Sequence, residues 1–230
     1  MYYSYGFDFS YLLVIIGMIL CMLAQAKVKS TFSRYSSVGA YSGLTGAEVA
    51  QRILEQNGIY DVSVARVSGS LTDHYDPSSK TLKLSEPVFG QRSIAAISVA
   101  AHECGHAIQD QENYAPLRIR ASLVPVANFG ASASWPLIIL GMFMGWNHTL
   151  IEIGILLFMA VVVFHFVTLP VELNASSRAL NILESSGILH GEENNYARKV
   201  LGAAALTYIA SAASMALQLL RLMLLNRRRR

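Results

Sequence analysis

The sequence predicts an α+β fold: a mainly helical membrane protein with a small antiparallel sheet and two helices that share a candidate metal site. The 230 residues are 53% hydrophobic and only 14% charged, with a mean hydropathy of +0.39. These values are too apolar for an ordinary soluble domain and too charged for a bare transmembrane bundle. Long apolar stretches alternate with a polar segment that contains short strand-like runs and His102-Glu103-Cys104-Gly105-His106.

Residues 7–26 form the first predicted transmembrane helix, a retained anchor because no Lys or Arg precedes it and no cleavage site stands out. Lys27, Lys29 and Arg34 follow this span, whereas its N-terminal end carries only Asp8. Since basic residues favour the cytoplasmic side, we expect the N-terminus outside and residues 27–120 in the cytoplasm.

The apolar residues 121–170 predict a transmembrane hairpin whose arms are separated only by Asn147 and His148. The hairpin would return the chain to the cytoplasmic side. Pro170 and the residues after it predict the start of a separate helix in the segment 171–199. Glu152 and His165 lie inside the second arm, where ionisable groups usually face protein or a water-filled cavity.

Residues 200–230 predict an apolar helix that packs on the cytoplasmic part and runs along the membrane interface. A crossing would place the four terminal arginines, 227–230, outside, against the charge rule. On the cytoplasmic side these arginines would meet anionic membrane lipid. A fourth transmembrane span is the alternative.

The polar part begins with a capping box, in which Thr45 and Glu48 satisfy early amides of a helix that Asn57-Gly58 ends. Three strands are then predicted from alternation, and Asp76-Pro77-Ser78-Ser79 forms the turn between the last two. The predicted strands are residues 62–67, 71–75 and 80–84.

His102 and His106 are four residues apart, so on a helix they present two imidazole nitrogens to one metal ion. Glu103 lies beside that metal and can reach a metal-bound water. This is the H-E-x-x-H pattern of zinc peptidases, in which the Glu is the general base, and it predicts a Zn²⁺ cofactor. The alternative is a pair of core histidines hydrogen-bonded to the backbone, with Glu103 paired to a basic side chain.

A catalytic zinc commonly takes three protein ligands and a water. Residues 109–113 contain no His, which excludes the metzincin pattern. Glu172 is the strongest candidate for the third ligand, because it follows the hairpin and returns to the side that holds the two histidines. The alternative is a carboxylate favoured by the dipole at a helix start.

The chain resembles the HtpX-type and CAAX-prenyl-type membrane metallopeptidases in three features. These are the HECGH helix, the segment Glu172-Leu173-Asn174-Ala175-Ser176 and the membrane hairpin between them. The runs 73–77 (DHYDP) and 82–85 (LKLS) are more closely similar to the YugP-like neutral zinc metallopeptidases, and this resemblance covers most of the chain. It implies a zincin-like helix pair of the glutamate type in a bacterial cell-membrane protein. It also implies zinc bound by His102, His106 and Glu172, with Glu103 as the base.

Related glutamate-type sites often carry an Asp four residues after the third ligand, where it orients a zinc-bound His. Here that position is Ser176, so its hydroxyl, Asn174 or a carboxylate from elsewhere must substitute. The donor that stabilises the oxyanion is also open. The chemically able side chains are His74, Tyr75, His165 and Tyr208.

The predicted function is a membrane-embedded zinc endopeptidase, with residues 27–120 as its catalytic part and an unfolded or membrane-associated polypeptide as substrate. By analogy with zincins, the hairpin from Tyr75 to Leu84 would hold that substrate by backbone pairing. One alternative is a non-catalytic membrane adaptor with a structural zinc, which would have no use for Glu103. Another is a zinc hydrolase of non-peptide substrates.

Nucleic acid is not an expected partner. The net charge is only +3, and the four terminal arginines alone exceed it. The sequence indicates no particular protein partner.

Overall fold

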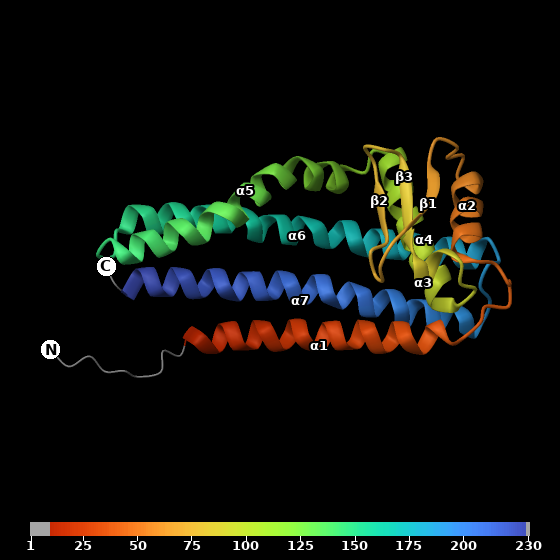
Figure 1. The fold of residues 1–230 in the computed structure, drawn as a ribbon, viewed down its shortest axis with the longest axis horizontal. Helices are drawn as coiled ribbons and strands as arrows, with labels where there is room; N and C mark the ends of the chain where they lie inside the picture. Colours follow the sequence, from red (N-terminus) through yellow and green to blue (C-terminus); the bar gives the residue numbers. More distant parts are fainter. Residues whose placement is uncertain (1–9, 229–230) are drawn as a thin grey trace. The chain divides into compact units, whose positions relative to one another are not determined.

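The computed structural model describes residues 10–228, and within them the chain forms seven helices and three strands (Figure 1). The mainly helical α+β class is therefore confirmed. Residues 7–9 of the first predicted span and the last two arginines of the basic tail lie outside the described residues. The elements are α1 Ser10–Ser36, α2 Gly46–Gln56, β1 Ser63–Val67, β2 His74–Asp76, β3 Thr81–Ser85, α3 Glu86–Phe89, α4 Ile94–Gln111, α5 Ala115–Phe143, α6 His148–Ser185 and α7 Glu192–Arg228.

The chain divides into two compact units. The first contains residues up to 24, residues 119–169 and residues from 207 onward. The second contains residues 25–118 and 170–206, so α1, α5, α6 and α7 each contribute a segment to both units. Every predicted metal ligand and the predicted base belong to the second unit.

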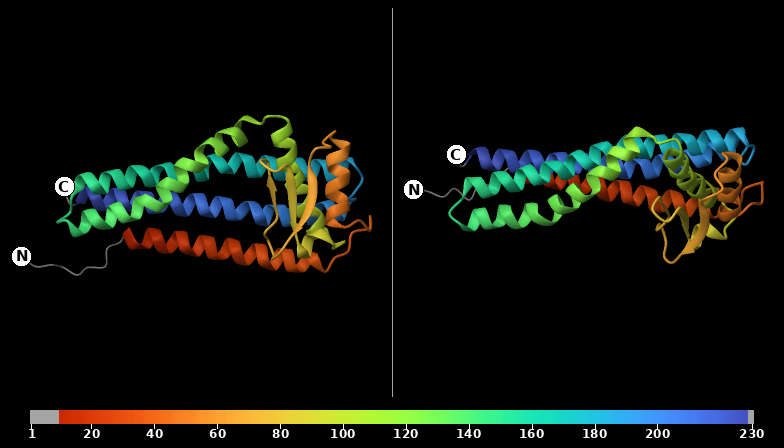
Figure 2. Two further views of the ribbon diagram at one scale, coloured as in Figure 1. Left: turned by 45° about the horizontal axis from the view of Figure 1, so that its top comes forward. Right: turned by 90° about the horizontal axis from the view of Figure 1, so that it is seen from above.

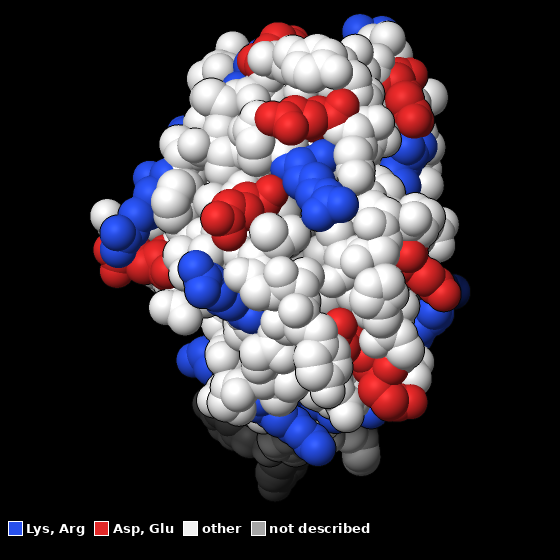
Figure 3. Space-filling model, turned by 90° about the vertical axis from the view of Figure 1, so that its right-hand side faces the viewer, with Lys and Arg blue, Asp and Glu red and all other residues white. Residues whose placement is uncertain are grey.

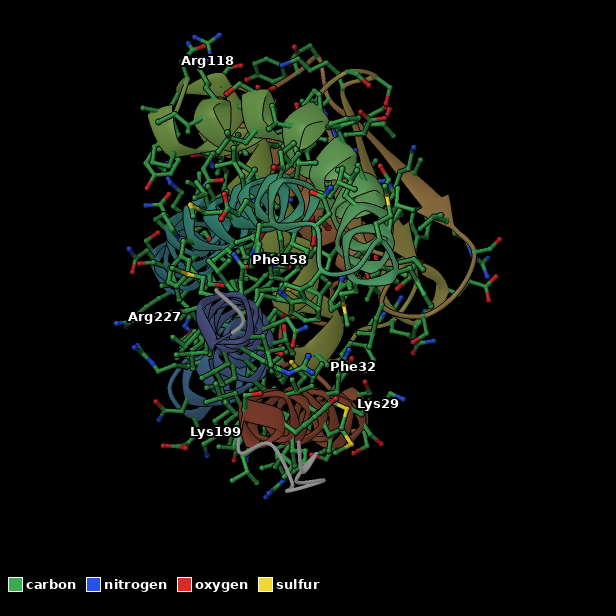
Figure 4. All side chains as sticks on the ribbon, turned by 90° about the vertical axis from the view of Figure 1, so that its left-hand side faces the viewer. Lys29, Phe32, Arg118, Phe158, Lys199 and Arg227 are labelled. Atoms are coloured by element: carbon green, nitrogen blue, oxygen red, sulfur yellow. The ribbon has the colours of Figure 1, made fainter. Side chains whose placement is uncertain are left out.

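The first unit is a set of apolar helical segments. Ile138, Ile151, Phe158 and Leu222, from α5, α6 and α7, are buried together at its centre. Figure 4 labels Phe158 inside this unit and Arg227 at its periphery. A Cβ at Gly130 would lie 2.6 Å from a carbonyl oxygen of α6, so the glycine allows the two helices to approach closely.

Four of the described helices, α1, α5, α6 and α7, are long and apolar enough to cross a membrane. The second half of α7 packs in the first unit, where the Arg221 guanidinium lies 4.4 Å from the centre of the Tyr11 ring. Near its end, Asn226 Oδ1 lies 3.4 Å from Nδ1 of His148. The length and composition of α7 are thus those expected for the alternative of a fourth span, while the interfacial placement of residues 200–230 stays a prediction.

The sheet of the second unit has the strand order β1-β3-β2. β2 pairs with β3 in the antiparallel sense, but β1 pairs with β3 in parallel, with Ser63 opposite Thr81 and Val67 opposite Ser85. The sheet is therefore mixed, not wholly antiparallel as predicted. The chain reverses direction twice between β1 and β3, so these two strands run the same way. Because β3 lies between β1 and β2, it pairs with both of them. Figure 2 shows the strands side by side, with α2 next to β1.

The predicted capping box is confirmed at the start of α2. The Thr45 amide donates to the Glu48 carboxylate over 2.7 Å, and the Glu48 amide donates to the Thr45 hydroxyl over 3.2 Å. Asn57 caps the other end, and Gly58 adopts φ of 70°, a left-handed conformation that glycine accepts without strain. Helix α2 then packs its apolar face against α4.

Helix α4 passes through the core of the second unit. Ser93 caps its first turn by accepting from the Ala96 amide over 3.2 Å. Its apolar residues pack with Ile53 of α2, Leu84 of β3, Leu183 of α6 and Leu201 of α7. Because almost every position of α4 is buried, a polar side chain on it must have a partner or bind something.

Pro170 does not start a helix, contrary to the prediction. It lies inside α6, which runs without interruption from His148 to Ser185. Proline removes one backbone hydrogen bond, but a long helix with ordered turns on both sides can retain its course through that defect. Glu172 is thus placed by the same helix that carries the second apolar arm.

Candidate metal centre

Two histidines and a glutamate of α4 form the first half of the site. The rings of His102 and His106 lie 4.9 Å apart between centres and are nearly perpendicular, at 83°. Glu103 is 7% exposed and His106 is 9% exposed. The helical spacing therefore brings both imidazoles together, as the sequence predicted, with His106 buried and His102 partly buried.

Glu172 of α6 completes the cluster. Its Oε2 atom lies 3.3 Å from Nε2 of His102 and 3.6 Å from Nε2 of His106. Donor atoms of all three residues fall within 4.8 Å of one another. Ligand atoms around a tetrahedral zinc, with bonds of about 2.0–2.1 Å, are separated by roughly 3.4 Å. The donor set and its spacing therefore fit a zinc ion.

The two helices of the cluster meet at a glycine. A Cβ at Gly105 would lie 2.6 Å from the carbonyl oxygen of Ala175 and 3.1 Å from its Cα atom. Both are backbone atoms, so neither can move away by a change of side-chain rotamer. The absence of a side chain at Gly105 lets α4 approach α6 closely enough for His106 to reach Glu172.

Gly105→Ala is expected to push α4 and α6 apart and to weaken zinc binding at least tenfold, because ligand geometry tolerates only a few tenths of an ångström. Gly202→Ala on α7 is the control, since nothing lies within 4 Å of its Cβ position. Replacing an unhindered helical glycine should stabilise the fold by about 0.5–1 kcal/mol. Zinc titration and thermal unfolding of both variants measure these effects, and wild-type zinc affinity in Gly105→Ala would contradict them.

Each histidine has a hydrogen-bond partner on its other ring nitrogen. Nδ1 of His102 lies 3.1 Å from the Ser176 hydroxyl, so Ser176 is the substitute among those that the sequence left open. Nδ1 of His106 lies 3.0 Å from Oε1 of Gln109, a residue that sequence reasoning missed. Its position three residues after His106, on the same helical face, was the available signal. Asn174 accepts a hydrogen bond from Gln109 and forms none with either histidine.

Glu103 has the surroundings of a proton acceptor. Its carboxylate forms no hydrogen bond with another of the described residues. Burial raises the pKa of Glu103, His102 and His106 oppose this rise, and Glu172 and Asp73 add to it. Burial opposes protonation of His106, but the neighbouring Glu172 carboxylate and the charge of Glu103 raise the pKa of His106 overall.

The four side chains considered as oxyanion donors are divided between the two units. His74 is exposed, and its Nδ1 lies 2.8 Å from the Thr72 carbonyl oxygen. The Tyr75 hydroxyl donates to Asp110 over 2.9 Å, and burial together with this bond raises the pKa of Tyr75. His165 and Tyr208 belong to the first unit. The structure thus selects none of the four.

Within the described residues, β2 is an outer strand of the sheet and β3 is paired on both sides. Only the first strand of the predicted substrate hairpin therefore has a free edge. The hydrogen bond between Tyr75 of β2 and Asp110 of α4 ties this strand to the metal helix.

Acidic and basic side chains are interspersed on the face shown in Figure 3, and neither sign forms a continuous patch there.

Buried H-E-x-x-H residues joined by a distal glutamate, in a chain with several membrane-length helices, define a class of membrane metalloproteins. Residues 10–227 match the family described as "Putative neutral zinc metallopeptidase". The chain belongs to this family, as the resemblance in its motifs predicted. A curated relative from Bacillus subtilis (strain 168), described as "Putative membrane protease YugP", is 53% identical over 213 residues, which are 93% of this chain and 94% of the relative. No solved structure matches the chain.

Proposed function

We propose that this chain is a membrane-embedded, zinc-dependent endopeptidase in which His102, His106 and Glu172 bind zinc and Glu103 is the general base. One observation carries the proposal: two imidazoles and a carboxylate converge within 4.8 Å in a buried site, beside a second carboxylate. Membership of a zinc metallopeptidase family gives this cluster its chemistry.

Zinc, when bound, would lower the pKa of a water molecule and polarise the scissile carbonyl. Glu103 takes the proton of the attacking water and then passes it to the leaving amine. Burial raises the pKa of Glu103 toward neutral pH. A carboxylate whose pKa is raised in this way can serve first as a base and then as an acid. Ser176 and Gln109 hold the two imidazoles in orientation through their Nδ1 atoms.

The proposed substrate is a polypeptide, unfolded or membrane-associated, bound as an extended strand against the outer edge of β2. The family description and the relative's name as a membrane protease support a peptide over another hydrolysable bond. A structural zinc in a non-catalytic adaptor is less well supported, because structural sites usually close with four protein ligands. Here three ligands converge, and Glu103 would have no role.

The full chain in detergent is expected to cleave fluorescein-labelled casein, an unfolded polypeptide. 1,10-Phenanthroline should abolish the cleavage, and added zinc should restore it. Detergent extract of cells carrying the empty vector is the control for contaminating proteases. Zinc-loaded protein that cleaves neither casein nor a mixture of short peptides would overturn the endopeptidase assignment and favour the non-peptide hydrolase.

We further propose that the site works at the cytoplasmic face of a bacterial cell membrane. Basic residues near the ends of the apolar helices support this orientation: Lys27, Lys29 and Arg34 in α1, and Arg118 and Arg120 in α5. The rule places these residues, and with them the second unit that contains most of them, inside the cell.

Cysteine labelling measures this orientation. In a Cys21→Ala background, Met144→Cys lies between α5 and α6 and Tyr60→Cys lies on the second unit, at positions 59% and 81% exposed. The buried Cys104 thiol, whose pKa burial raises, should stay unreactive. A membrane-impermeant maleimide should label Met144→Cys in intact cells and Tyr60→Cys only after permeabilisation. The opposite pattern would place the site outside.

A further inference from the structure

We infer that Gln109 is a positioning residue whose side-chain amide sets the tautomer of His106, so that Nε2 offers its lone pair to the metal. This inference deepens the proposed function and rests on its assignment of His106 as a ligand. The residues that carry it all belong to the second unit.

The Gln109 side chain is completely buried, at 0% exposure, and is hydrogen-bonded at both ends. Nε2 donates to the Val171 carbonyl oxygen and to Oδ1 of Asn174, each over 2.9 Å. Oε1 faces Nδ1 of His106 at 3.0 Å. The amide thus joins a metal ligand of α4 to two α6 residues close to Glu172 in sequence, one directly before it and one two residues after it.

The direction of these hydrogen bonds is determined by groups that can only accept or only donate a hydrogen bond. A backbone carbonyl such as that of Val171 can only accept. The Arg178 guanidinium can only donate, and its Nε donates to Oδ1 of Asn174 over 2.7 Å. Both α6 partners of Gln109 are therefore oxygen acceptors, and a reversed amide would set its own oxygen against them.

The amide oxygen must therefore face His106. That oxygen can only accept, and it lies 3.0 Å from Nδ1, whereas the other acceptor, Oε2 of Glu172, lies 3.6 Å from Nε2, beyond hydrogen-bond distance. In neutral His106 the proton is therefore expected on Nδ1. Nε2 is then unprotonated and points toward Glu172, where the metal ligands converge. Arg178 is itself held by Glu112 over 2.7 Å and lies over the Tyr114 ring at 5.9 Å, so the outer end of the chain of bonds is anchored.

His102 is different. Its Nδ1 partner is the Ser176 hydroxyl, which can either donate or accept, so its surroundings do not determine a tautomer. Of the two ligand histidines, only His106 therefore has a tautomer that its hydrogen-bond partner fixes before metal binds.

A glutamine also adds no charge. The carboxylates of Glu172 and Glu103 already balance the two positive charges of zinc, and a carboxylate at position 109 would leave the site negative. The neutral amide thus orients His106 without weakening zinc as a Lewis acid.

The test is long-range ¹⁵N-histidine NMR of the metal-free full chain in detergent, at alkaline pH where imidazoles are neutral, with His106→Gln identifying the resonances. Wild type should show His106 as the Nδ1–H tautomer alone. Gln109→Met should show a mixture and bind zinc about 10–100-fold more weakly in a chelator competition. The control, Gln111→Met on an exposed position of α4, should match wild type in both.

Gln109→Glu separates tautomer control from simple tethering of α4 to α6, because Glu keeps the acceptor for His106 and loses both donors. Retention of the Nδ1–H signal in Gln109→Glu supports the inference. Equal loss in the Met and Glu variants, or an unchanged tautomer in Gln109→Met, overturns it. Wild type that binds no zinc would instead contradict the proposed function, with the metal-free tautomer still measurable.

Discussion

Glu103→Gln is expected to retain zinc and to lose peptide hydrolysis by roughly 10²–10⁴-fold, the usual contribution of a positioned general base. The amide has the shape of the carboxylate but cannot accept the proton of water. Since Glu103 contributes no atom to the three-residue cluster, its replacement should leave that cluster intact. Casein cleavage and zinc content, measured on one detergent preparation, separate the two effects.

Glu55→Gln is the matched control for Glu103→Gln. Glu55 lies exposed on α2, where it accepts a hydrogen bond from Gln51, and it should keep wild-type cleavage. Undiminished cleavage by Glu103→Gln would show that another group takes the proton. Zinc lost from Glu103→Gln would mean that this carboxylate supports metal binding itself.

The metal content of the purified chain should be about one zinc per molecule in wild type and close to zero in His106→Ala and Glu172→Ala. Catalytic zinc sites depend on three protein ligands, and two remaining donors do not hold the ion through purification. At free zinc 100-fold above its dissociation constant, the ion would stabilise the wild-type fold by about 2.7 kcal/mol. Thermal unfolding with and without chelator measures this contribution.

Glu184→Ala provides the control for Glu172→Ala, because Glu184 is an exposed glutamate of the same helix. Glu184→Ala should retain zinc, and zinc should stabilise its fold against thermal unfolding as in wild type. Zinc retained by Glu172→Ala would place the third ligand elsewhere and weaken the proposed site. No metal in gently purified wild type would support the alternative of hydrogen-bonded core histidines.

The parts of the structure that follow from local spacing were predictable. His102 and His106 converge because a helix repeats every 3.6 residues, and the Thr45 capping box needs only its own four residues. Glu172 required one more step, since its role depends on which side of the membrane the hairpin returns to. The family resemblance supplied the same residue independently.

Other features depend on contacts between distant segments and were not predictable. The parallel pairing of β1 with β3 is decided by where β3 inserts between two strands. The passage of α6 through Pro170 depends on the ordered turns on both sides of it. The bonds of Gln109 to Val171 and Asn174 join segments 62 and 65 residues apart, which no local pattern reports.

The contact between Gly105 and Ala175 has a consequence for recognising this kind of site in genomes. H-E-x-x-H leaves its two middle positions unrestricted, and short patterns of this kind match many unrelated chains by chance. In this fold a side chain at the second of those positions would meet the backbone of Ala175, which is itself completely buried. A search for H-E-x-G-H followed downstream by E-x-x-A, in which Glu172 precedes Ala175, joins both halves of the helix contact. Such a composite signature should find relatives too divergent for overall sequence identity to reveal.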